Sequence, residues 1–233
     1  MQAVILCGGK GTRLSEETKL IPKPMVEIGG KPILWHIMKL LSFYNVTDFI
    51  IAAGYKIEVI KKNLNIFNEF KKVQLVDTGA KTLTGGRILR LKKFFQSDEN
   101  FIMTYGDGLS DIRVDELINF HKKHKKIATV TAVHPPVRFG ELELHGDKVQ
   151  SFEEKPQAKA GWINGGFFVL NSKIFNYIEN DQTIFEREPL TKLSKESNLM
   201  AFKHEGFWQC MDTLRDKNLL NKMIDEKNTP WLK

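Results

Sequence analysis

The chain has 233 residues, of which 42% are hydrophobic and 27% are charged, so it is long enough for one large α/β domain or two small ones. Its net charge of +7 suits anionic small molecules, but no arginine-rich tract or aromatic–basic alternation predicts a nucleic-acid partner. No apolar run has the length of a membrane span, no signal-peptide pattern is present, and Cys7 and Cys210 fit neither a metal-ligand pattern nor a disulfide framework. We therefore expect a cytoplasmic protein without a membrane partner.

Strand-like and helix-like segments alternate along the first 133 residues. We expect buried strands at 3–7, 48–55, 73–79, 100–108 and 127–133, and helices at 32–45, 57–70, 85–95 and 114–126. This order predicts a Rossmann-like α/β fold, in which a mixed, mostly parallel sheet carries helices on both faces. Ligands of such sheets bind beyond the carboxyl ends of the strands, so we expect residues 8–13, 77–86 and 104–108 to converge on one crevice.

The pattern changes after about residue 134. Residues 139–156 alternate apolar and polar positions around the turn HGDK, which predicts an antiparallel hairpin. A strand at 162–171, a helix at 189–198, a strand and turn at 200–213 and a final helix from Leu214 follow. We expect 1–233 to form a single domain in which residues 134–233 pack on residues 1–133 as a small antiparallel lobe that binds an acceptor.

A glycine-rich turn with two cations follows the first strand. Gly8, Gly9 and Gly11 lack a Cβ, so the turn can take positive φ angles and bring backbone N–H groups close to an anion. Arg13 adds a forked cation and Lys23, between two prolines, a compact one. The alternative interpretation is a tight strand-to-helix turn with a surface arginine.

Three further charged residues follow predicted strands. Asp107 lies in YGDG, where a carboxylate between glycines is suited to Mg²⁺, although such a sequence is also typical of a polar turn. Asp212, in MDT, is a second acid, with an N-cap of the following helix as its alternative role. Lys155, in EEKP, is either functional or a surface charge. We expect HKKHKK at 121–126 to be a solvated helix face.

Six motifs in order resemble those of the sugar-phosphate nucleotidylyltransferases, enzymes that join a nucleoside triphosphate to a sugar 1-phosphate. They are GGxGTRL at 8–14, PKP at 22–24, YGDG at 105–108, FxEKP at 152–156, NGGFFV at 164–169 and FWxxMDT at 207–213. Longer segments, such as KPMVEIGGKPILWHIMK and MDTLRDK, most resemble the sequences of family members that transfer CMP from CTP to glucose 1-phosphate in surface polysaccharide biosynthesis. The resemblance covers nearly the whole chain and implies the nucleotide-diphospho-sugar transferase type of fold.

The resemblance also implies roles for individual residues. It assigns nucleotide binding, within residues 1–133, to Leu6, Gly8, Gly9, Gly11, Thr12, Arg13, Lys23, Thr84, Arg87 and Asp107. It assigns Mg²⁺ to Asp107 and Asp212, acceptor binding to Lys155, Asn164 and Gly165, and catalysis to Arg13, Lys23 and Lys155. The implied partners are CTP, a phosphorylated small-molecule acceptor and further copies of the chain in a homo-oligomer. For Arg87, a surface position at a helix N-terminus and contact with a neighbouring subunit's site are both open.

Two departures from the cytidylyltransferase pattern leave the acceptor and the assembly open. The segment before the predicted strand 73–79 is shorter than in those relatives, and Ile21 stands where they commonly have a basic residue. Relatives that accept other phosphorylated groups, including phosphoglutamine in capsule phosphoramidate synthesis, are therefore an alternative. Two alternatives come from other classes of protein. A dinucleotide-binding oxidoreductase would carry GxGxxG and an acidic residue about 20 positions further on, whereas this chain has GGKG followed by PKP. A relative that is inactive and serves a regulatory role would not need Arg13, Lys23, Asp107, Lys155 and Asp212 together.

Overall fold

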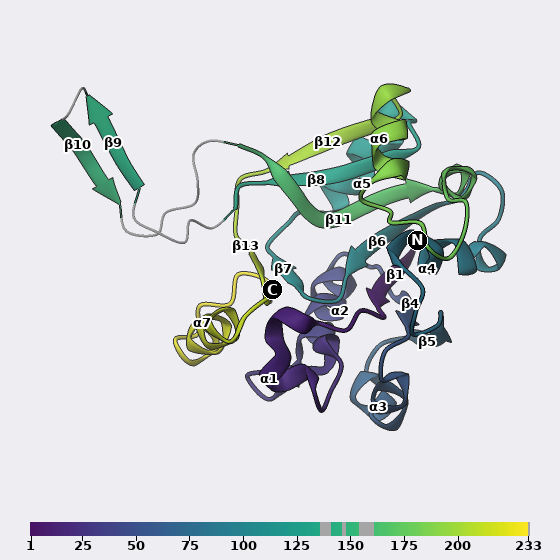
Figure 1. The fold of residues 1–233 in the computed structure, drawn as a ribbon, viewed down its shortest axis with the longest axis horizontal. Helices are drawn as coiled ribbons and strands as arrows, with labels where there is room; N and C mark the ends of the chain where they lie inside the picture. The colour runs from purple at the N-terminus through teal and green to yellow at the C-terminus, as the bar shows by residue number, and fades with distance from the viewer. Residues whose placement is uncertain (136–140, 146–147, 154–160, 233) are drawn as a thin grey trace.

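The computed structural model describes residues 1–135, 141–145, 148–153 and 161–232, and a seven-stranded sheet forms its centre (Figure 1). The strand order is β12-β8-β11-β6-β1-β4-β5. The bounds are Gln2–Cys7 for β1, Asp48–Ala53 for β4, Lys72–Asp77 for β5, Asn100–Tyr105 for β6, Ala128–Val133 for β8, Ile163–Asn171 for β11 and Leu199–His204 for β12. Strand β11 runs antiparallel to both of its neighbours, whereas the other pairs in this sheet are parallel. The predicted mixed, mostly parallel sheet is confirmed.

Helices cover both faces of the sheet, which explains why residues 3–7 of the interior strand β1 are all apolar. Ala3, Ile5 and Cys7 belong to one buried core, and the alternate residues Val4 and Leu6 belong to the other. The helices are α2 (Ile33–Phe43), α3 (Ile57–Lys62), α5 (Val114–His124) and α7 (Leu214–Asp225) on the first core, and α4 (Thr84–Arg90) and α6 (Glu188–Lys195) on the second. Both cysteines are free thiols, as expected.

Short elements divide or precede several of the predicted ones. The expected helix 57–70 ends at Lys62 and continues as a 3₁₀ turn, and the helix expected at 85–95 begins at Thr84 and ends at Arg90. The unpredicted elements are η1 (Thr12–Leu14), α1 (Ser15–Thr18), η2 (Lys23–Met25), β2 (Glu27–Ile28), β3 (Lys31–Pro32), η3 (Leu64–Phe67), η4 (Lys92–Phe94), β7 (Gly108–Ser110) and η5 (Ser172–Tyr177). Elements of two to six residues contain too few positions for a hydrophobic period to show.

The second half of the chain contributes small antiparallel sheets, as expected, but also completes the main sheet. Strands β9 (Glu141–His145) and β10 (Lys148–Glu153) form the predicted hairpin, which stands apart from the main sheet (Figure 1). Strands β7 (Gly108–Ser110) and β13 (Trp208–Cys210) form a second antiparallel pair. Strand β11, however, lies between β8 and β6, so residues from both halves of the chain share one core.

The basic segment 121–126 differs from the expected solvated face. Its lysines are exposed or half-buried, but His121 is buried and its Nδ1 lies 2.8 Å from the hydroxyl of Thr129, while Nε2 of His124 lies 2.7 Å from the same oxygen. Burial, and then the neighbouring His124, lowers the pKa of His121 to about 4. Within the described ranges, no helix has the length and apolar character needed to cross a membrane.

Candidate functional site

A cavity of about 560 Å³ opens at the carboxyl ends of β1 and β6, where the three predicted segments converge. Every predicted site residue that the structure describes lines it: Leu6, Gly8, Gly9, Gly11, Thr12, Arg13, Lys23, Thr84, Arg87, Asp107, Asn164, Gly165 and Asp212. Lys155 lies outside the described residues. Ile21 packs against the hydrophobic core and does not belong to this lining.

Arg87 holds the glycine-rich turn from within its own chain. Its side chain donates to the carbonyl of Gly8 at 2.8 Å, to the hydroxyl of Thr78 at 2.7 Å and to the carbonyl of Gly79 at 2.8 Å. These partners follow two different strands, so one guanidinium ties the loops after β1 and β5 together. Arg87 is only 4% exposed, and the surface alternative is wrong.

The structure explains why glycine is needed at positions 8 and 11 of the turn, while position 9 has room for a side chain. A Cβ on Gly8 would lie 2.0 Å from the guanidinium carbon of Arg87, whereas a Cβ on Gly9 would meet nothing within 4 Å. Gly11 has φ of 63°, in the left-handed region, and directs the chain into η1, which carries Arg13. The turn is therefore shaped both by its own conformation and by the arginine beneath it.

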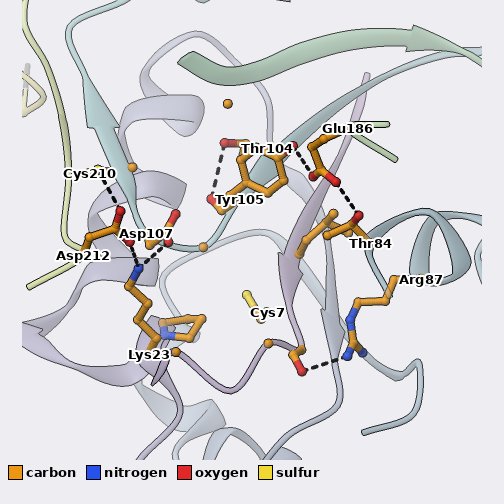
Figure 2. Close-up of a pocket in the computed structure, with 18 of the residues that line it drawn as sticks. Cys7, Lys23, Thr84, Arg87, Thr104, Tyr105, Asp107, Glu186, Cys210 and Asp212 are labelled. Atoms are coloured by element: carbon orange, nitrogen blue, oxygen red, sulfur yellow. Dashed lines mark hydrogen bonds and ion pairs between the residues drawn. The ribbon is translucent and has the colours of Figure 1, made fainter. Parts of the chain in front are cut away.

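Lys23 lies between two carboxylates at one end of the cavity (Figure 2). Its Nζ is 2.6 Å from Oδ2 of Asp107 and 2.5 Å from Oδ1 of Asp212, and its side chain is 9% exposed. Burial acts to lower the pKa of Lys23, but the contacts with Asp107 and Asp212 outweigh it and the pKa is raised. Burial acts to raise the pKa of Asp212, but the contacts with Lys23 and Arg13 together outweigh it and the pKa is lowered.

Asp212 can pair with Lys23 because Thr213, and not Asp212, caps helix α7. Thr213 is the N-cap of α7, and it forms a capping box with Asp216, so the N-cap alternative for Asp212 is wrong. Asp212 instead accepts from Lys23 and from Arg13, whose side chain is 71% exposed. Asp107 comes from the turn between β6 and β7.

The two carboxylates suit a hard divalent cation. Both contact the same Lys23 Nζ, so their oxygens face one point, and oxygen is the ligand that Mg²⁺ prefers. Among the residues that the structure describes, no group of three or more His, Cys, Asp or Glu residues forms a complete metal cage. Mg²⁺ is commonly held by one or two carboxylates together with substrate phosphates, and the pair fits that arrangement.

The cavity also contains residues that sequence reasoning missed. Glu186 accepts from the hydroxyl of Tyr105 and, at 2.6 Å, from that of Thr84 (Figure 2), and Trp208 donates from Nε1 to the carbonyl of Gly165 at 2.7 Å. Burial, and then Glu186, raises the pKa of Tyr105, which keeps its phenol protonated. Tyr105 and Trp208 fall within YGDG and FWxxMDT, so the motifs could have indicated them. Glu186 lies in FEREPL, which carries no recognisable signal.

A mixed α/β sheet with a glycine-rich turn, a buried lysine and paired carboxylates at one edge defines a nucleotide-binding protein equipped for polyphosphate chemistry. The model of the nucleotidyl transferase family matches residues 2–216, and this chain belongs to that family. The family sets aside the oxidoreductase alternative, and the protein is a nucleotidyltransferase.

Two named relatives align with this chain over nearly its whole length. The chain is 49% identical to a glucose-1-phosphate cytidylyltransferase of Salmonella typhimurium, covering 99% of this chain and 98% of the relative. It is 43% identical to a probable glucose-1-phosphate cytidylyltransferase of Bacillus subtilis, covering 99% of each. The Salmonella alignment spans 253 positions, 20 more than this chain has residues, so the relative contains segments that are missing here.

Solved structures support the fold. HddC from Yersinia pseudotuberculosis superposes with a TM-score of 0.77 at 29% identity, covering 96% of this chain and 99% of that one. A UDP-glucose pyrophosphorylase complexed with UDP-glucose gives a TM-score of 0.72 at 17% identity, covering 97% of this chain and 98% of that one. At this identity the similarity supports the fold alone. The nucleotide-diphospho-sugar transferase fold is thereby confirmed.

Proposed function

We propose that this enzyme transfers CMP from CTP to a sugar 1-phosphate, with glucose 1-phosphate as the first candidate, and releases pyrophosphate in a Mg²⁺-dependent reaction. The observation that carries the proposal is the convergence of the glycine-rich turn, Lys23 and the Asp107–Asp212 pair in one cavity. CTP and glucose 1-phosphate come from the names of the Salmonella and Bacillus relatives.

The chemistry requires two anions to meet. An oxygen of the acceptor phosphate forms a bond to the α-phosphorus of CTP, and the bond from that phosphorus to the oxygen bridging to the β-phosphate breaks. The electron pair leaves with pyrophosphate. The acceptor phosphate is already ionised at neutral pH, so no general base is needed, and catalysis rests on positioning and fixed positive charge.

The chain's own residues divide this work. Backbone N–H groups of the glycine-rich turn cradle the phosphates, while Arg13 and Lys23 offset the charge that collects on pyrophosphate. Asp107 and Asp212 would hold Mg²⁺, which when bound offsets phosphate charge. We assign contact with the acceptor phosphate to Lys155, on the resemblance alone.

Residues 134–233 supply the proposed acceptor side. Asn164 and Gly165 lie on β11 and line the same cavity as the glycine-rich turn, with β6 between β11 and β1 in the sheet. The side chain of Asn164 accepts from the backbone N–H of Gly166 at 2.8 Å, within an irregular segment of β11 between Asn164 and Phe168. A homo-oligomer in the cytoplasm remains a prediction, and sedimentation velocity measures the assembly directly.

The test is pyrophosphate release measured over a matrix of the four nucleoside triphosphates against sugar 1-phosphates and phosphoglutamine. We expect the CTP row to respond with a sugar 1-phosphate, and Asp107→Asn to lower turnover about 10²-fold or more at limiting Mg²⁺. If CTP reacts with phosphoglutamine and with no sugar 1-phosphate, the acceptor is phosphoglutamine and the proposed sugar 1-phosphate is wrong. Absence of release in the whole CTP row would refute cytidylyl transfer and leave an inactive relative or another nucleotide.

A further inference from the structure

Glu186 places a carboxylate in the cavity away from the cations Arg13 and Lys23, which contact the Asp107–Asp212 pair. It lies in the connection that leads from β11 into α6 and lines the same cavity as the glycine-rich turn. Figure 2 shows it across the cavity from Lys23, beside Thr84 and Tyr105. A carboxylate repels phosphates, so the side of the cavity at Glu186 is suited to a different chemical group.

The carboxylate of Glu186 is held in a fixed orientation. One oxygen accepts from the Tyr105 hydroxyl and the other from the Thr84 hydroxyl at 2.6 Å. The Thr84 oxygen also accepts from the backbone N–H of Phe185 at 3.0 Å, so its own hydrogen is directed to Glu186. A carboxylate oxygen can accept two hydrogen bonds, so these contacts leave acceptor capacity on both oxygens for a bound molecule.

Tyr105 connects Glu186 to the proposed acceptor side. A Cβ on Gly166 would lie 2.8 Å from the Tyr105 ring, so the segment of β11 that carries Asn164 packs closely against Tyr105. Trp208 contacts the same segment of β11 by donating to the Gly165 carbonyl. Glu186 therefore lies, through Tyr105, near the segment of β11 that carries Asn164, while the cations Arg13 and Lys23 lie at the other end of the cavity with Asp107 and Asp212.

We propose that Glu186 selects acceptors by their hydroxyl groups: its carboxylate accepts hydrogen bonds from the sugar and disfavours acceptors that carry a carboxylate there. The inference rests on the proposed function. Hydrogen bonds to a charged acceptor are stronger than neutral ones, and a site built around such an acceptor discriminates against a ligand that lacks the donor. An amino group on the nucleotide base presents the same donor chemistry, and the experiment distinguishes the two sources.

The test is a double-mutant cycle between Glu186 and individual sugar hydroxyls. Wild type, Glu186→Ala and Glu186→Gln are assayed with glucose 1-phosphate and with its monodeoxy and monofluoro analogues, in which a donor is removed. For wild type we expect kcat/KM to fall by about 10-fold or more with at least one analogue. For Glu186→Ala that analogue and the parent sugar should react alike, while the KM for CTP stays within about 2-fold.

Glu188→Gln is the matched control, because Glu188 is an exposed glutamate two residues further along, at the start of α6. It should keep the wild-type preference among analogues. Urea unfolding checks that the variants fold, and Glu186→Gln, which preserves the side-chain size, carries the comparison if the alanine variant does not.

Two results would overturn the assignment to acceptor hydroxyls. One is an equal penalty for every deoxy analogue in wild type and variant; the other is a change confined to the KM for CTP, which would assign Glu186 to the base. Failure of the proposed function is a separate result, since wild type would then release no pyrophosphate with CTP and any sugar 1-phosphate.

Discussion

Replacing Lys23 by Met removes the cation that contacts both Asp107 and Asp212 and keeps a side chain of similar length. The side chains of Lys23 and Asp212 are 9% and 10% exposed, and that of Asp107 is 27% exposed. Removing one partner of a buried ion pair costs about 3–5 kcal/mol, because the other charge stays buried without compensation. Asp107 is partly solvated and Arg13 remains beside Asp212, so we expect the lower end of this range, about 3 kcal/mol.

The measurement is urea unfolding of wild type and Lys23→Met with and without MgCl₂. In a thermal unfolding experiment on a chain of this size, a loss of about 3 kcal/mol corresponds to a fall in Tm of about 6–12 °C. Without Lys23 the two carboxylates repel each other, so Mg²⁺ should restore some of the lost stability in the variant and change wild type little. Turnover should fall by about 10²-fold or more, since the variant lacks a cation proposed to face the leaving pyrophosphate.

Lys72→Met is the control, because Lys72 pairs with Asp48 at an exposed position and such pairs contribute about 0–1 kcal/mol. A loss below about 1 kcal/mol in Lys23→Met would show that the cluster is not a buried charge network, and no stabilisation of either protein by Mg²⁺ would contradict a cation site at Asp107 and Asp212.

Further predictions concern the turn and a buried histidine. Gly8→Ala should destabilise the fold in urea and weaken CTP binding, since its Cβ would displace the Arg87 guanidinium, whereas Gly9→Ala should retain wild-type stability. Arg87→Lys should cost about 2 kcal/mol through buried carbonyls left without donors, and Arg90→Lys, on the exposed side of the same helix, less than about 1 kcal/mol; equal losses would contradict the bracing role. His121 has a pKa of about 4 in the folded protein and about 6.5 unfolded, so the unfolded state takes up its proton first and stability falls by up to about 3 kcal/mol as the pH drops from 6.5 to 4. His121→Gln should flatten unfolding free energy against pH in that window, and an unchanged slope would assign the acid sensitivity to other groups.

Much of the fold could be predicted because its signals are local. The apolar run 3–7 required burial on both faces, and the structure places alternate residues of β1 in two cores. The boundaries of α3 and α4 were less certain because the last turns pass into 3₁₀ turns without a break in the apolar pattern. The insertion of β11 between β8 and β6 was not predictable from its own residues, since an apolar strand fits a parallel or an antiparallel neighbour equally well.

The sequence by itself determined the chemistry of one half of the site. A glycine-rich turn after a buried strand permits a bound anion because glycine reaches positive φ angles, and a carboxylate between glycines suits a hard cation. The resemblance of six motifs in order then assigned the nucleotide phosphates to the turn and Mg²⁺ to Asp107 and Asp212. Tertiary structure decided which atoms meet. Arg87 contacts loop carbonyls, and Glu186 contacts Thr84 and Tyr105, because the sheet brings together side chains up to 102 positions apart. Such contacts depend on strand order and register, which no local pattern encodes.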